Sequence, residues 1–126
     1  MSELKSFYSN LIAAVGERDL ARVQSLIDPA FVIHYDASLP FGGRYEGMQG
    51  FFTVLTELGS IADLKTEPVN YMESADGENY TLIIDLSATT PSGRAITTQV
   101  SEVWTVRDGK AVEARVWFWG AAGLFD

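Results

Sequence analysis

The sequence predicts one α+β domain in which helices come first and a meander of strands follows. Three observations predict it. Before residue 60, hydrophobic residues recur mostly at the three- and four-residue spacing of helices. From residue 64 onward they alternate with a period of two, as strands do. The chain has 126 residues, of which 47% are hydrophobic, which suits one compact core. We therefore expect a single domain over residues 1–126.

Three helices and one short strand are expected before residue 60. The first helix should begin at residue 2 or 3 and end at residue 16, and its buried stripe comprises Leu4, Phe7, Leu11, Ile12 and Val15. Asp19 is placed to cap a second helix with a stripe over residues 20–27, which Pro29 ends. Residues 31–35 are β-branched and aromatic, which is typical of a strand. A third helix over residues 48–58 should end at Gly59 as its cap.

Four strands are expected after the helices, over residues 64–73, 80–90, 95–106 and 112–119. Asp76-Gly77, residues 91–93 and Asp108-Gly109 mark the turns between them. Pro68 indicates that the first of these strands lies at an edge or contains a bulge. Strands this long twist and curl, so helices on the concave side should leave an elongated hollow, where ligands bind by default.

A glycine-rich connection over residues 39–48 lies between the short strand and the third helix. Gly42, Gly43 and Gly47 fall within six residues, which predicts a tight connection where the backbone makes close approaches. The connection borders the expected hollow but does not identify a ligand.

Composition and motifs argue against several classes of partner, cofactor and chemistry. The formal charge of −8 and the pI of about 4.5 argue against nucleic acid and anionic membranes as partners. The absence of cysteine excludes disulfides and thiolate chemistry, and a single histidine argues against a zinc site. No phosphate-binding glycine loop or nucleophile elbow occurs, so no metal or cofactor is expected. The N-terminal residues do not read as a signal peptide and no apolar run is long enough for a bilayer, so a cytoplasmic location is expected.

The chain resembles the nuclear transport factor 2-like superfamily, which includes ketosteroid isomerases and SnoaL-like polyketide cyclases. The resemblance rests on the order of elements, on residues 31–34, on SLPFGGRYEGMQGFF (residues 38–52) and on VWTVRDGKAVEARVWF (residues 103–118). It implies a cone-shaped fold, with a curled antiparallel or mixed sheet and three N-terminal helices around a pocket. It also implies a homodimer through the sheet. The same fold hosts isomerases, dehydratases, cyclases, hydrolases and binding modules, so the resemblance does not select an activity.

Three family positions carry over with substitutions. The position of the general-base aspartate of ketosteroid isomerases matches His34, and that of their oxyanion-hole acid matches Glu102. The oxyanion-hole tyrosine is replaced by Leu11, with Tyr8 one turn earlier. The aspartate that SnoaL-like chains often carry near the last strand is absent from residues 117–120.

Two catalytic groups are expected from the residues themselves. Histidine is the side chain that ordinarily changes charge near neutral pH, so His34 is a candidate general base, with Asp36 on the same strand face to orient it. The alternative is a half-buried histidine bonded to a backbone carbonyl. Glu102 shares a face with apolar Val100 and Trp104, where a carboxylate is costly unless it is paired, protonated or wet. If protonated, it can donate a hydrogen bond to an oxyanion, and the alternative is an ion pair with an arginine such as Arg115.

The expected binding surface is aromatic. Trp104 and Phe118 should form a wall for a flat apolar or aromatic ligand, and the lining is completed by Tyr45, Phe52 and Leu11. Alternation places Trp117 and Trp119 on the opposite, convex face, where a dimer interface explains them.

Two functions remain open from the sequence. The first is a cofactor-independent isomerase, cyclase or dehydratase that transfers protons on a small, largely apolar carbonyl compound. The second is a non-catalytic ligand-binding or dimeric interaction module of the same fold. A cavity shared by His34 and Glu102 would favour the enzyme.

Overall fold

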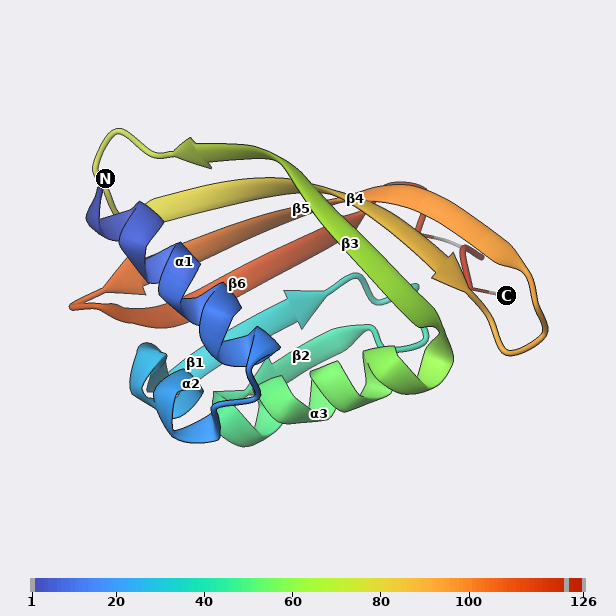
Figure 1. The fold of residues 1–126 in the computed structure, drawn as a ribbon, viewed down its shortest axis with the longest axis horizontal. Coiled ribbons are helices and arrows are strands. Elements are labelled where there is room, and N and C mark those ends of the chain that lie inside the picture. Colours follow the sequence, from blue (N-terminus) through green and yellow to red (C-terminus); the bar gives the residue numbers. More distant parts are fainter. Residues whose placement is uncertain (1, 122, 126) are drawn as a thin grey trace.

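The computed structural model describes residues 2–121 and 123–125. The elements in chain order are α1 (Glu3–Gly16), α2 (Leu20–Leu26), β1 (Ile27–Tyr35), β2 (Gly43–Glu46), α3 (Gly47–Ile61), β3 (Asp63–Glu73), β4 (Asn79–Thr89), β5 (Ala95–Arg107) and β6 (Lys110–Phe118). Helices therefore precede most of the sheet, and the predicted α+β class is confirmed (Figure 1). Within the described residues, no helix is both long and apolar enough to cross a membrane.

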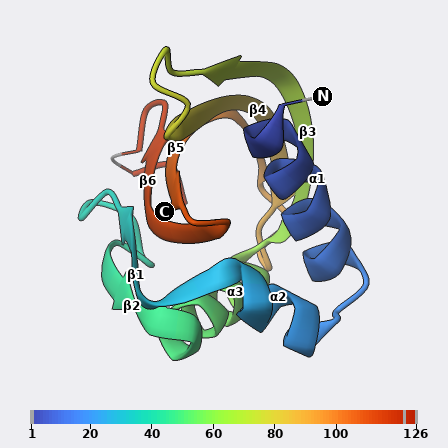
Figure 2. The ribbon, with the colours of Figure 1, turned by 90° about the vertical axis from the view of Figure 1, so that its left-hand side faces the viewer.

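The strands form one mixed sheet in the order β2-β1-β6-β5-β4-β3. β1 runs parallel to β6, and the other neighbours are antiparallel. Figure 2 shows the sheet curling round without closing, with the helices on its open side. This is the curled, cone-like sheet that the long strands predicted.

The concave face of the sheet carries the core. Alternate residues of β4, from Tyr80 to Ala88, are buried, and the cross-strand register continues this face onto β5 and β6. Four near-parallel rings cross it: Tyr71 stacks on Tyr80, Tyr80 on Trp104, and Trp104 on Phe31. Trp104 reaches Phe31 over β6, where its register partner is the fully buried Ala114, whose small side chain leaves room.

Several local predictions are confirmed. The Ser2 hydroxyl accepts the Lys5 N–H at the start of α1, and Asp19 caps α2. β3 is an edge strand whose register shifts just after Pro68. Asp108 and Gly109 both have positive φ, as a two-residue hairpin turn requires.

Two element boundaries differ from the predictions, and one strand was not predicted. β1 begins at Ile27 and runs through Pro29, with an irregular register that leaves Pro29 outside the ladder. β2 was not expected, because its four residues are too few to show an alternation. α3 runs to Ile61, and Gly59 lies inside it instead of capping it, because the backbone turns extended only at Ala62.

Candidate functional site

A carboxyl group lies on the concave face at Glu102 of β5. The register places Glu102 between Leu82 of β4 and Val116 of β6, both of which are buried. Along β5, its neighbours on this face are the buried Val100 and Trp104. Glu102 itself is half-buried.

Within the part of the chain that the structure describes, the carboxyl group has a single polar partner. The indole Nε1–H of Trp104 donates to Glu102 Oε1 at 2.9 Å. Burial raises the pKa of Glu102, and this outweighs the hydrogen bond from Trp104, which lowers it. Within the described residues no basic side chain pairs with Glu102, since Arg115 pairs with Glu113 instead. Burial therefore shifts this carboxyl group toward its protonated form, which has a proton to donate.

Three tyrosines lie close enough to this carboxyl group for its charge to affect their pKa values. Tyr8 comes from α1, Tyr35 from β1 and Tyr80 from β4. Burial raises the pKa of each phenol, and the nearby charge of Glu102 raises it further. Tyr8 is therefore close enough to Glu102 for electrostatic interaction, although it lies one turn before the position matched to the family tyrosine. Leu11, at that matched position, is buried in the core.

The structure does not bring His34 together with Glu102. His34 is in register with Arg115 of β6, whereas Tyr35 is in register with the inward-facing Val116. His34 therefore points to the convex face, where its Nε2 lies 3.1 Å from Glu113 Oε2. The expectation that His34 faces the pocket is wrong. It depended on which face of β1 the helices cover, and His34 lies on the opposite face.

Asp36 does not orient His34. Its Oδ1 accepts hydrogen bonds from the backbone N–H of Ser38 at 2.8 Å and the Ser38 hydroxyl at 2.6 Å. These bonds lower the pKa of Asp36, which is exposed beyond the end of β1. Glu113, the actual partner of His34, was missed because the parallel pairing of β1 with β6 leaves no signal in the sequence.

The remaining predicted binding residues occupy different places. Trp104 lies beside Glu102, with its rings stacked between Tyr80 and Phe31. Phe118 is buried against Phe41 and Tyr35, away from solvent.

Tyr45 and Phe52 sit apart from the carboxyl. The hydroxyl of Tyr45 donates to the backbone oxygen of Phe41 at 2.8 Å, which fixes it within the connection between β1 and β2. Phe52 lies on α3 beside a hollow between the helices. Of the five predicted binding residues, Trp104 is the only one that the described structure hydrogen-bonds to Glu102.

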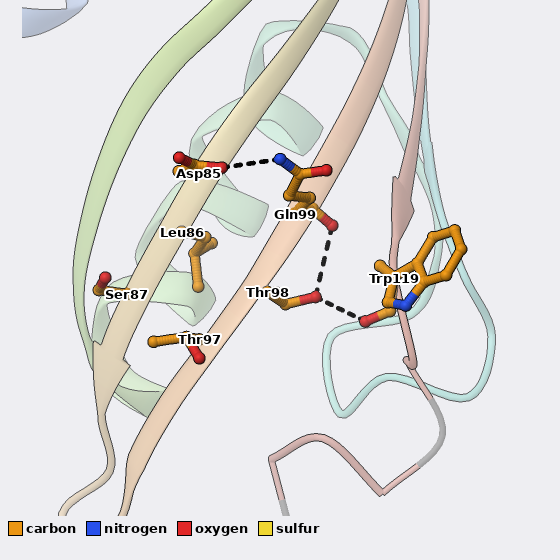
Figure 3. A pocket seen from close by; sticks show the side chains of 7 residues that line it. All are labelled: Asp85, Leu86, Ser87, Thr97, Thr98, Gln99 and Trp119. Carbon is orange, nitrogen blue, oxygen red and sulfur yellow. Dashed lines mark hydrogen bonds between the residues drawn. The ribbon is translucent and has the colours of Figure 1, made fainter.

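A polar hollow of about 530 Å³ opens at the far end of β4 and β5 (Figure 3). Asp85 accepts a hydrogen bond from Gln99 there at 2.9 Å, and the Thr98 hydroxyl donates to the backbone oxygen of Trp119. The Trp119 ring extends away from these strands and is 82% exposed. The hollow is lined by polar side chains of β4 and β5 together with Leu86 and Trp119.

Comparison with known proteins establishes the family. A model of the SnoaL-like domain matches residues 8–114, and the chain belongs to this family. No curated protein sequence matches the chain significantly.

Solved structures share the fold at low identity. An NTF2-like protein of unknown function from Burkholderia pseudomallei is 22% identical with a TM-score of 0.82, over 96% of this chain and 94% of that one. TerC, co-crystallised with polyporic acid, is 20% identical with a TM-score of 0.79, over 94% and 93% of the two chains. A structure assigned as a SnoaL-like polyketide cyclase from Jannaschia sp. CCS1 is 17% identical with a TM-score of 0.67, over 79% and 71%.

Proposed function

We propose that the protein binds a small, largely apolar carbonyl compound inside the curled sheet, with protonated Glu102 donating a hydrogen bond to the carbonyl oxygen. One observation carries the proposal: a carboxyl group lies on a concave apolar face, its only polar partner among the described residues is an indole N–H, and burial raises its pKa. A carboxyl group kept neutral in this way is a hydrogen-bond donor at neutral pH.

The reaction class that suits such a donor is proton transfer next to a carbonyl. Isomerisation, cyclisation and dehydration each place negative charge on a carbonyl oxygen, and a donor held in place before the reaction stabilises that charge. Tyr8 is the second hydrogen-bond donor in this proposal. Its phenol is half-buried, and it is close enough to Glu102 that the charge of Glu102 raises its pKa. The names of the cyclase and of an isomerase-assigned structure from Rhodopseudomonas palustris support this class.

The alternative function is a non-catalytic ligand-binding or dimeric interaction module. The position of His34 on the convex face favours it, because the predicted general base lies away from the acid. The exposed Trp117 and Trp119 on that face suit a homodimer through the sheet.

A thermal-shift screen with planar ketones separates these functions. A compound at about ten times its Kd should stabilise the wild type by about 1.4 kcal/mol, a shift of several degrees. Turnover of the best compound should fall about 100-fold in Glu102→Leu, which removes the hydrogen-bond donor, whereas Glu102→Gln keeps an amide N–H that still donates. His34→Ala is the matched control and should stay within about twofold of the wild type.

Two results would overturn the enzyme proposal. Stabilisation without turnover would support the binding module. Equal turnover by Glu102→Leu and the wild type would remove Glu102 from the reaction and leave the proposed mechanism without its donor.

A further inference from the structure

A second hollow lies where the three helices meet, outside the site around Glu102. It has a volume of about 560 Å³, within the range of small-molecule pockets. Figures 1 and 2 agree that α2 lies between the end of α1 and the beginning of α3. None of the residues that line it belongs to the group around Glu102.

The walls of this hollow are apolar. They are formed by Val15, Leu20, Val23, Phe52 and Leu55. Leu20 is 59% exposed although it is a large hydrophobic residue. Covering such a side chain with an apolar group is favourable in free energy, because it removes apolar surface from water.

A single cation, Arg18, lines the same hollow. Its backbone has φ of +56°, in the left-handed region that glycine adopts most easily. The residues around it form the usual helix-ending pattern, with Arg18 N–H donating to the Val15 oxygen and Asp19 N–H to the Ala14 oxygen. Glycine is the common residue at this position, so an arginine here is unfavourable for the backbone.

The guanidinium of Arg18 is not used inside the fold. It has no hydrogen-bond or ion-pair partner within residues 2–121 and 123–125. The acidic neighbours on either side are occupied, because Glu17 pairs with the Arg22 guanidinium at 3.3 Å and Asp19 accepts the Arg22 N–H at 3.2 Å. An unpaired cation beside apolar walls complements a ligand with one anionic end and one apolar end.

We propose that this hollow binds a small aliphatic carboxylate. The alkyl chain lies against the apolar walls, and the carboxylate accepts hydrogen bonds from the Arg18 guanidinium, which is suited to a two-oxygen acceptor. The backbone strain at Arg18 is then explained by a side chain that glycine cannot supply.

Sodium octanoate is a suitable probe, with 1-octanol as the uncharged control. Titration by calorimetry and by amide chemical shifts should show that the wild type binds octanoate and that the shifts centre on residues 15–23 and 52–56. Arg18→Gly should weaken octanoate binding about tenfold or more, because a charge-assisted contact is lost. Its melting temperature should equal or exceed that of the wild type, because glycine relieves the strain. Binding of 1-octanol should not change.

Further variants make the result specific. Arg18→Lys should keep most of the octanoate affinity, since the charge remains. Glu102→Gln should bind octanoate as the wild type does, so this site can fail or succeed independently of the proposed function. Equal octanoate affinity in Arg18→Gly and the wild type would overturn the inference. So would the absence of binding, or shifts that centre on β5.

Discussion

At the scale of the residue, the behaviour of Glu102 follows from its strand position. Its side chain shares the concave face with Val100 and Trp104, so folding removes much of its hydration. Among residues 2–121 and 123–125, the Trp104 N–H is the only hydrogen-bond partner that compensates, and burial prevails in raising the pKa. The sequence predicted that this carboxyl group lies on an apolar face, where its charge is costly in free energy. It did not predict what offsets this cost, since an ion pair with an arginine on another strand was equally compatible.

This pKa makes stability depend on pH through Glu102. An unfolded glutamate titrates near 4.5, and folding raises the pKa above that value. The stabilising contribution is therefore complete below about pH 4.5 and is lost as the pH rises through the folded pKa. We expect the free energy of unfolding of the wild type, relative to Glu102→Gln, to decrease between pH 4.5 and pH 8. Urea unfolding at a series of pH values measures this difference.

The comparison with Glu102→Gln isolates the contribution of Glu102 to the pH dependence of stability. Asp36, Glu73 and Asp76 have lowered pKa values from hydrogen bonds, so their contributions have the opposite pH dependence. They are present in both proteins and cancel in the difference. A difference that is constant with pH, or that increases, would contradict a raised pKa at Glu102.

At the scale of the element, the connection between β1 and β2 depends on a close backbone approach. A Cβ on Gly42 would lie 2.1 Å from the backbone oxygen of Asp36, so no side chain fits there. Gly59, by contrast, lies inside α3 with nothing within 4 Å of the corresponding position. The two glycines that the sequence singled out thus have different roles.

Alanine substitutions at these glycines should have opposite effects. Gly42→Ala should lower the free energy of unfolding by about 1–3 kcal/mol, because the backbone must move to admit the methyl group. Gly59→Ala should raise it by about 0.5–1 kcal/mol through helix propensity. Chemical denaturation of both variants measures this. Similar stabilities for the two would argue against the close approach.

The elements also show what the sequence could and could not predict. Local chemistry was sufficient where one residue type determines the outcome, as at the Asp19 cap and the Asp108-Gly109 turn. The side of β1 that faces the helices was not predictable, because it depends on parallel pairing with β6, about 80 residues later in the chain. That single choice of face separates His34 from the candidate site.

At the scale of the whole molecule, the convex face remains to be explained. Trp117 is 49% exposed and Trp119 is 82% exposed. The contact between His34 and Glu113 and the ion pair between Arg115 and Glu113 lie on the same side of β1 and β6. A central aromatic patch beside polar groups is the usual composition of a protein interface. The acidic surface as a whole limits non-specific association.

We expect a homodimer that depends on these tryptophans. Trp117→Ser should weaken dimerisation about 30-fold or more, as truncation of a central aromatic residue does, without unfolding the protein. Ile12→Ser, at a similarly exposed residue of α1, is the control and should leave the dimer intact. Sedimentation equilibrium measures both. A monomeric wild type at high concentration would contradict a dimer through the sheet.

The most direct measurement is a carbon-detected NMR titration of the Glu102 side-chain carboxyl group, with Glu102→Gln to assign its signal. The expected result is a midpoint above neutral pH, together with a shift of the Trp104 indole N–H resonance at the same midpoint. That would establish a neutral acid inside the curled sheet. A midpoint below neutral pH would mean that Glu102 is mainly a carboxylate at neutral pH, and it would contradict its role as a proton donor.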